Sequence, residues 1–198
     1  MGRKFVTACA PFIGWAALVA CAPSPLPKAA AGTGALLIPK NLAATQGLAI
    51  DTACVVSGVE LCFNAIDDNC NGLIDEGCGL RSGPIQLTVA WGDAPVDIDL
   101  RLTVPSGDTV SDEIRTITGF RLDRDCPGDG CGEQNYENLF ATEEPPLGHY
   151  LVTVRLADLF GTLSPVKAVL SVRVGSRSYR LRLEFAKVGD TRTFAFDL

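Results

Sequence analysis

Apolar and polar residues alternate along most of the chain from residue 84 onward. This period of two is typical of a β-strand that has one buried and one exposed face. The clear alternating segments are residues 85–91, 96–104, 150–156, 168–174, 179–185 and 194–198, and a weaker one spans residues 114–122. Turn-forming stretches, such as residues 105–108 and 187–190, separate them. We therefore predict an all-β fold, an immunoglobulin-like antiparallel β-sandwich, over residues 83–198.

The first twenty residues lack this alternation and have the pattern of a secretory signal peptide. Arg3 and Lys4 precede a short apolar run over residues 12–20, which is too short for a stable membrane span. Residues 18–21, Leu-Val-Ala-Cys, resemble a bacterial lipobox. The resemblance implies cleavage before Cys21, a lipid on that cysteine and an outer-membrane anchor facing the periplasm or the cell surface. Ordinary signal cleavage at the same small residues is the alternative.

Residues 21–50 show no sustained period of 2 or 3.6. Pro23, Pro25 and Pro27 favour an extended backbone without hydrogen-bond donors. We predict that this segment begins with the lipidated Cys21 and continues as a flexible tether.

Six further cysteines predict a disulfide-rich segment over residues 51–82 and a small closed loop beyond it. An even number of cysteines in an exported chain favours disulfides. They are Cys54, Cys62, Cys70, Cys78, Cys126 and Cys131. Proximity in the sequence favours two bridges among the first four and a third between Cys126 and Cys131. A zinc site would need closely spaced cysteine pairs, usually with histidine, which this pattern lacks.

Within the disulfide-rich segment, residues 67–78 place oxygen-bearing side chains in the register of an EF-hand-type calcium loop. Alternate side chains of a tight loop point inward, and Gly72 stands at the sharp turn. The predicted ligands are the side chains of Asp67, Asn69, Asn71, Asp75 and Glu76 and the carbonyl group of Leu73. The alternative is a disulfide-stapled turn whose Asp and Asn side chains cap backbone groups.

Residues 60–78 also resemble the Cys-rich metal-binding repeat of MopE-type bacterial surface proteins. The core of that repeat corresponds to DDNCNGLIDE at residues 67–76, whereas Phe63 and Ala65 depart from its usual opening. The resemblance implies metal binding, and some members of the family are associated with copper. We expect calcium instead, because copper prefers soft or imidazole ligands and the chain has one His and one Met.

A second group of acidic and amide side chains lies within the predicted sandwich. Asp97 and Asp99 are two positions apart on one strand and therefore point to the same side, where their mutual repulsion calls for a compensating charge. Further oxygen-rich stretches follow at residues 122–125 and 137–138. The possible second metal site comprises Asp97, Asp99, Asp123, Asp125, Glu137 and Asn138. A solvated strand face is the alternative for the first two residues.

The order of these stretches resembles YfaP-type bacterial sandwich domains over residues 84–198. The matching residues are Trp91, Asp97, Asp99, Leu100, Leu122, Asp123, Asp125, Glu137, Asn138, Leu139, Pro145, Pro146, Gly148 and Tyr150. This chain departs from the family pattern by placing Cys126 and Cys131 within the loop that follows Asp125. The resemblance implies the fold and leaves the role open.

The net charge of the chain limits the kinds of ligand and partner that it can be expected to bind. The chain has 17 basic and 23 acidic residues; removing residues 1–20 takes away two basic ones, which leaves 15 against 23 and a net charge of −8. This balance favours cations as ligands and argues against nucleic acid as a partner. The single His and the lack of a nucleophile elbow argue against an enzyme.

We therefore predict an exported bacterial surface lipoprotein that binds calcium and presents its sandwich to a cell-surface protein or a glycan. A structural spacer stapled by disulfides and carrying no metal is the first alternative. A metal-dependent hydrolase that uses Asp97, Asp123 and His149 is the second.

Overall fold

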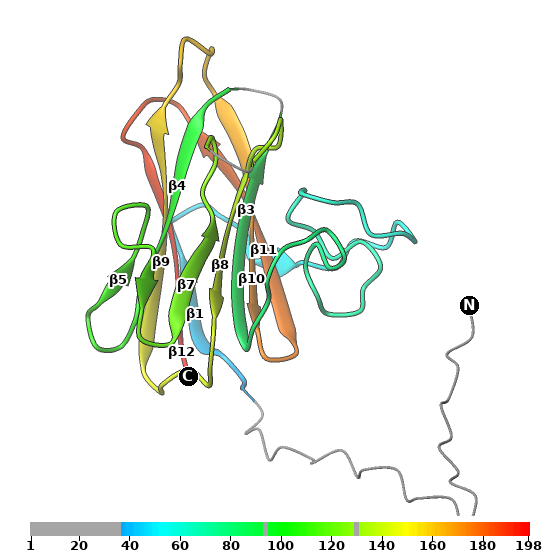
Figure 1. Ribbon diagram of the computed structural model, residues 1–198, viewed down its shortest axis with the longest axis vertical. Coiled ribbons are helices and arrows are strands. Elements are labelled where there is room, and N and C mark those ends of the chain that lie inside the picture. Colours follow the sequence, from blue (N-terminus) through cyan, green and yellow to red (C-terminus); the bar gives the residue numbers. More distant parts are fainter. Residues whose placement is uncertain (1–36, 93–94, 129–130) are drawn as a thin grey trace, which may run out of the picture. The chain divides into compact units, whose positions relative to one another are not determined.

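Two antiparallel β-sheets form the fold of the computed structural model (Figure 1). The structure describes residues 37–92, 95–128 and 131–198, so the predicted signal peptide and Cys21 lie outside the described residues. In this described part every regular element is a β-strand, and no helix is present that could cross a membrane. The all-β antiparallel sandwich expected from the sequence is confirmed.

The two sheets have the strand orders β1-β12-β9-β4-β5 and β2-β11-β10-β3-β8-β7-β6. The strands of the five-stranded sheet are β1 (Lys40–Ala44), β12 (Thr191–Asp197), β9 (His149–Asp158), β4 (Asp97–Thr103) and β5 (Thr109–Val110). Those of the seven-stranded sheet are β2 (Asp51–Thr52), β11 (Arg177–Phe185), β10 (Val166–Val174), β3 (Ile85–Trp91), β8 (Tyr136–Ala141), β7 (Phe120–Arg124) and β6 (Thr116–Ile117).

The core is built from the apolar side of each alternating segment. Ile98, Leu100 and Leu102 of β4 are fully buried, and so are Val152 and Val154 of its partner β9. Removing these branched side chains from water is the main favourable term for such a fold, at about 25 cal/mol per Å² of apolar surface. The period of two in the sequence therefore reports this packing directly.

Four strands were missed by the alternation: the two-residue strands β2 and β5, and the longer β1 and β8, of which β1 corrects the predicted tether. Residues 40–44, which the sequence places in the tether, form β1 and pair antiparallel with β12. Residues 136–141 form β8, in which every residue is buried. The weak segment at 114–122 divides between β6 and β7. Neither β1 nor β8 alternates in hydrophobicity: β1, KNLAA, is largely exposed, and β8, YENLFA, carries both polar and apolar residues on each of its buried faces.

The Cys-rich segment covers the outer side of the seven-stranded sheet, and both belong to one compact unit (Figure 1). The Ser171 hydroxyl donates to the Ala65 carbonyl at 2.5 Å, and the Gln86 side-chain amide donates to the Ile74 carbonyl at 3.2 Å. The ring of Phe63 stacks on that of Tyr136 with centroids 4.6 Å apart. Polar side chains on this face of the sheet are therefore buried under the segment rather than solvated.

We call the most regular of these side chains the polar row, because its members lie side by side across four strands. Cross-strand pairing places Asn138 opposite Thr88, Thr88 opposite Ser171, and Ser171 opposite Arg180. All four residues are buried. Backbone carbonyl groups of the Cys-rich segment need donors on this face, which explains why the row is polar.

The disulfides join Cys54 to Cys70, Cys62 to Cys78, and Cys126 to Cys131. The first two each link cysteines 16 residues apart and interleave, whereas the third closes a short loop. This confirms two bridges among the first four cysteines and one between the last two.

Candidate metal centre

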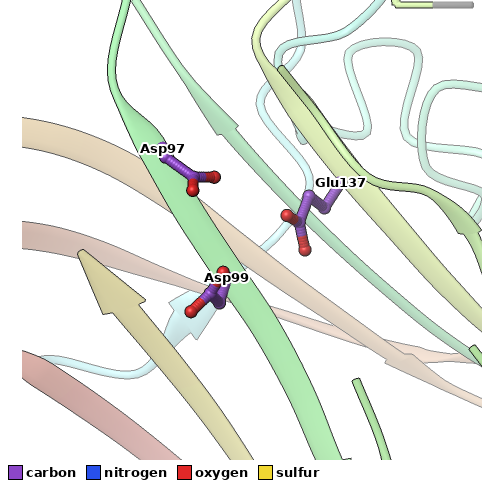
Figure 2. Close-up of side chains that lie close together, drawn as sticks. All are labelled: Asp97, Asp99 and Glu137. Atoms are coloured by element: carbon purple, nitrogen blue, oxygen red, sulfur yellow. The ribbon is translucent and has the colours of Figure 1, made fainter. Parts of the chain in front are cut away.

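Three carboxylates meet where β4 and β8 approach one another. Asp97 and Asp99 project from β4 and Glu137 from β8 (Figure 2). One oxygen atom from each of the three residues lies within 4.8 Å of the other two. Glu137 comes from the seven-stranded sheet and the two aspartates from the five-stranded sheet, so the group bridges the two halves of the sandwich.

The meeting point exists because one edge of β4 is only partly paired. β9 pairs with β4 along its whole length, but on the other side β5 pairs only with Leu102 and Thr103. The backbone N–H of Leu100 therefore lacks a strand partner and donates to Oε2 of Glu137 at 2.7 Å. A carboxylate thus closes a gap in the hydrogen bonding of the sheet edge.

In the part of the chain that the structure describes, the carboxylate of Glu137 is buried without a neighbouring positive charge to compensate it. The residue is 0% exposed, and among the described residues its Oε1 atom has no hydrogen-bond donor. Burial raises the pKa of Glu137 well above its ordinary value, and the neighbouring carboxylate of Asp125 raises it further. A buried carboxylate without a counter-charge is unfavourable, so either a proton or a cation must compensate it.

The pKa values of the two aspartates are raised as well. Burial raises the pKa of Asp97 to about 6, and the negative charge of Asp99 adds to the effect. Burial also raises the pKa of Asp99, although Arg155 donates to its carboxylate at 3.1 Å. Arg101 lies 3.6 Å from the same oxygen of Asp99 but is closer to Asp112, at 3.0 Å. The positive charge available is thus divided among more acids than it can neutralise.

The chemistry of these donors suits a hard divalent cation. All three side chains offer oxygen, which Ca²⁺ and Mg²⁺ prefer, and none offers the sulfur or imidazole that softer metals select. A proton shared between Glu137 and a neighbouring carboxylate is the alternative occupant, because it would relieve the same repulsion. The two occupants predict different responses to added calcium: a cation site is stabilised by it, whereas a pair that shares a proton does not respond.

Other members of the predicted second site lie nearby or elsewhere. Asp125 is near Glu137 but forms an ion pair with Arg115 at 3.2 Å. Asp123 instead accepts the backbone N–H of Arg81 at 3.2 Å. Asn138 follows Glu137 directly on β8 and so points to the opposite face, where its side-chain oxygen accepts from Thr88 at 2.9 Å. The predicted set therefore divides between the two faces of the sheet.

In the Cys-rich loop two of the acidic side chains predicted as ligands, Asp67 and Asp75, bind backbone groups. Asp67 accepts the N–H groups of Asn71 and Gly72 at 3.0 and 2.9 Å. Asp75 accepts those of Asn64 and Ala65 at 3.2 and 3.1 Å, and burial raises its pKa to about 6. These contacts belong to a capped turn, which is the alternative that the sequence left open.

Three of the predicted loop ligands do converge. Oε1 of Glu76 lies 2.5 Å from the side-chain amide of Asn69 and 2.6 Å from that of Asn71. As placed, both amides donate to the carboxylate, which makes a hydrogen-bonded cluster without any ion. Leu73 takes part through its N–H, which donates to the side-chain oxygen of Asn71 at 2.8 Å.

Sequence reasoning missed several residues that hold these two regions. Glu60 accepts the N–H groups of Asp68, Asn69 and Asp75 and so ties the start of the Cys-rich loop to its end. No sequence signal distinguishes it from an exposed glutamate. The alternation places Arg155 on the polar face of a predicted strand, but its position opposite Asp99 follows from the pairing of β4 with β9, which the sequence does not reveal.

The structure separates the residues that the hydrolase alternative requires. His149 begins β9 and Asp158 ends it, and Asp158 is the cross-strand partner of Asp97. His149 therefore lies at the far end of this ten-residue strand from the carboxylate group and contacts Asp197 at 2.7 Å.

Comparison with protein-family models, with curated proteins and with solved structures finds no match to this chain.

Proposed function

We propose that this chain is an exported, lipid-anchored protein of a bacterial envelope whose sandwich binds calcium and presents a surface for recognition or adhesion. The cation is held by Asp97, Asp99 and Glu137. Its role is structural: it joins β4 to β8 and so fixes the two sheets at this edge. No catalytic step is assigned to it.

The observation that carries the cation proposal is the fully buried carboxylate of Glu137, with one oxygen that has no donor in the described part of the chain and two aspartates within reach. An acidic group on the surface would carry no such weight, because water solvates it. Export is supported by the three disulfides, which persist in oxidising compartments, and by the lipobox-like residues 18–21. The net negative charge argues against nucleic acid as a partner.

Calcium titration of the protein tests the proposal. We expect calorimetry to show one site in the sandwich, and we expect excess calcium to raise the unfolding temperature relative to a chelator. Asp97→Asn should weaken the binding, whereas Asp108→Asn, in the exposed turn between β4 and β5, should not. A thermal transition that is the same in calcium and in chelator would contradict the proposal.

The response to calcium should also depend on pH. Asp97, with a pKa raised to about 6, and Glu137, with a pKa raised well above its ordinary value, keep protons in the calcium-free folded protein after the unfolded chain has lost them. The stability of the calcium-free protein should therefore fall as the pH rises from about 4 through these raised values. The charged groups around the pair are Asp99, Asp112, Asp125, Asp158, Arg101 and Arg155.

Calcium must displace these protons, so its stabilising effect should be small near about pH 5 and larger near about pH 8. Melting curves in calcium and in chelator across this range measure the difference. Calorimetry in buffers of different ionisation enthalpy should show proton release on binding near about pH 6. A calcium effect that is constant with pH would place the ion away from these carboxylates.

For the Cys-rich segment a structural role is the second candidate. The two oxygens of Asp67 and the two of Asp75 are occupied by backbone N–H groups, as in a turn that folds without a metal. A second calcium site there would add a binding event that Asp97→Asn leaves intact. Calorimetry on that variant separates the two candidates.

A further inference from the structure

The Cys-rich segment and the seven-stranded sheet enclose a groove that the cation proposal does not use. Its volume is about 610 Å³, within the range of small-molecule sites. Ala90 of β3 and Val169 of β10, which are cross-strand partners, contribute to its lining on the outer face of the sheet. Phe63 and Ile66 contribute from the Cys-rich segment.

The aromatic side of the groove is held rigidly. Phe63 stacks on Tyr136, and both Phe63 and Ala65 have positive φ angles, 65° and 55°. Such a backbone is unfavourable for residues other than glycine and persists only when its surroundings impose it. Here the buried carboxylate of Asp75 imposes it by accepting the N–H groups of Asn64 and Ala65. The apolar wall is thus formed before any ligand arrives.

The rim of the groove carries an excess of positive charge. Lys167, Arg182 and Glu184 line it from β10 and β11. Lys167 forms no ion pair among the described residues, and the side chain of Arg182 is 72% exposed with only a 3.8 Å contact to Asp51. Glu184 is the cross-strand partner of Lys167, so the charged residues that line the groove are two cations and one anion, with one positive charge in excess among them.

We propose that this groove binds a small anionic amphiphile, a molecule with an apolar chain or ring and one carboxylate or sulfonate group. The apolar part lies against Ala90, Val169 and Phe63, and the anionic group lies between Lys167 and Arg182. Burial of its apolar part gives the ligand its affinity, and the two cations orient the ligand and select for an anionic group. The site is independent of calcium and depends on the Cys-rich segment for one of its walls.

Fluorescence titration of the full chain with anilinonaphthalene sulfonate, in the presence of a chelator, tests the proposal. We expect the emission to saturate near one equivalent, and we expect dodecanoate to displace the probe more effectively than dodecanol. Lys167→Glu should weaken binding about tenfold. Arg177→Glu makes the same change of charge on an exposed residue at the other end of β11 and should leave binding unchanged.

Val169→Glu places a carboxylate on the apolar lining and should abolish probe binding, with unchanged melting showing that the fold is intact. Emission that rises without saturation would overturn the proposal, since it indicates probe scattered over the surface. Equal weakening by Lys167→Glu and Arg177→Glu would overturn the groove as the site. Equal displacement by dodecanoate and dodecanol would overturn the requirement for an anionic group.

Discussion

Glutamine in place of Glu137 should abolish the stabilisation by calcium and, at about pH 8, should raise the unfolding temperature of the calcium-free protein. Calcium at about 100 times its dissociation constant stabilises a folded protein by about 2.7 kcal/mol. For a domain of this size that corresponds to roughly 5–10 °C in the unfolding temperature. Glu137→Gln should lose this increment, because an amide cannot replace the charge of a buried carboxylate ligand.

The second half of this expected result follows from burial. Without calcium the carboxylate of Glu137 is fully buried, and its Oε1 lacks a donor among the described residues. The glutamine carbonyl can still accept the N–H of Leu100, and its amide can donate to the carboxylates of Asp97 or Asp99. Relief of an unsatisfied buried group is worth about 1–3 kcal/mol. The calcium-free variant should therefore be more stable than the calcium-free wild type.

Thermal unfolding in calcium and in chelator measures both effects on the same protein. Glu144→Gln, which makes the same chemical change at an exposed position, should behave like the wild type in both conditions. A Glu137→Gln protein that still responds fully to calcium would exclude Glu137 as a ligand. A wild type without any calcium response, combined with a stabilised variant, would identify a shared proton as the native occupant.

The strands that the sequence predicted are those with one apolar face. In β4, Ile98, Leu100 and Leu102 are buried between the sheets while Arg101 is partly exposed, and Asp99 is the position that departs from the alternation because it is buried as well. β8 could not be found in this way, although burial on both faces is not the reason, because β3 is also buried throughout and still alternates in sequence. In β8 each face mixes polar and apolar residues, since Glu137 is buried between the sheets beside Leu139 and Asn138 is buried under the Cys-rich segment beside Tyr136.

The candidate metal centre was predicted only in part, for a related reason. Asp97 and Asp99 share a face by the period of two, and this required no knowledge of the fold. Glu137 lies near them only because the two sheets pack on one another, and sequence spacing does not reveal this packing. Asn138 could have been excluded, since adjacent residues on one strand point to opposite faces, had residues 136–141 been recognised as a strand.

The polar side chains on the outer face of the seven-stranded sheet gave the most misleading signal. Thr88, Ser171 and Arg180 alternate with core residues, as solvent-facing positions do in an ordinary sandwich. The Cys-rich segment covers them, and the contact of Ser171 with Ala65 spans 106 residues of sequence. Nothing local in the sequence predicts a contact of that range.

Removal of both interleaved disulfides should unfold the Cys-rich segment while the sandwich remains folded. Each bridge links cysteines 16 residues apart, and a loop of about that length is stabilised by about 3 kcal/mol through the lost entropy of the unfolded chain. Its apolar core is small, because Ala53, Ala65 and Ile74 are its only fully buried apolar side chains among the described residues. So small a core does not hold a fold by itself.

The sandwich should remain folded, because the surface that the segment uncovers is polar. Its departure exposes the polar row, whose hydroxyl, amide and guanidinium groups water can solvate, whereas an apolar face would favour aggregation. Hydrogen exchange on a variant with serine at Cys54, Cys62, Cys70 and Cys78 should show lost protection over residues 54–80 and retained protection in β4, β9 and β10. The same variant should lose the probe bound in the groove, since Phe63 and Ile66 would no longer form its wall.

A variant with serine at Cys126 and Cys131 is the matched control. It removes a bridge of sequence separation five outside the segment and should leave both the protection of residues 54–80 and the groove unchanged. Loss of protection throughout the sandwich together with the Cys-rich segment, in one cooperative step, would contradict the prediction. It would mean that the contacts of Ser171 and Gln86 with the segment are part of the folding core, and the segment would then be a third layer of the domain rather than a cover placed on two.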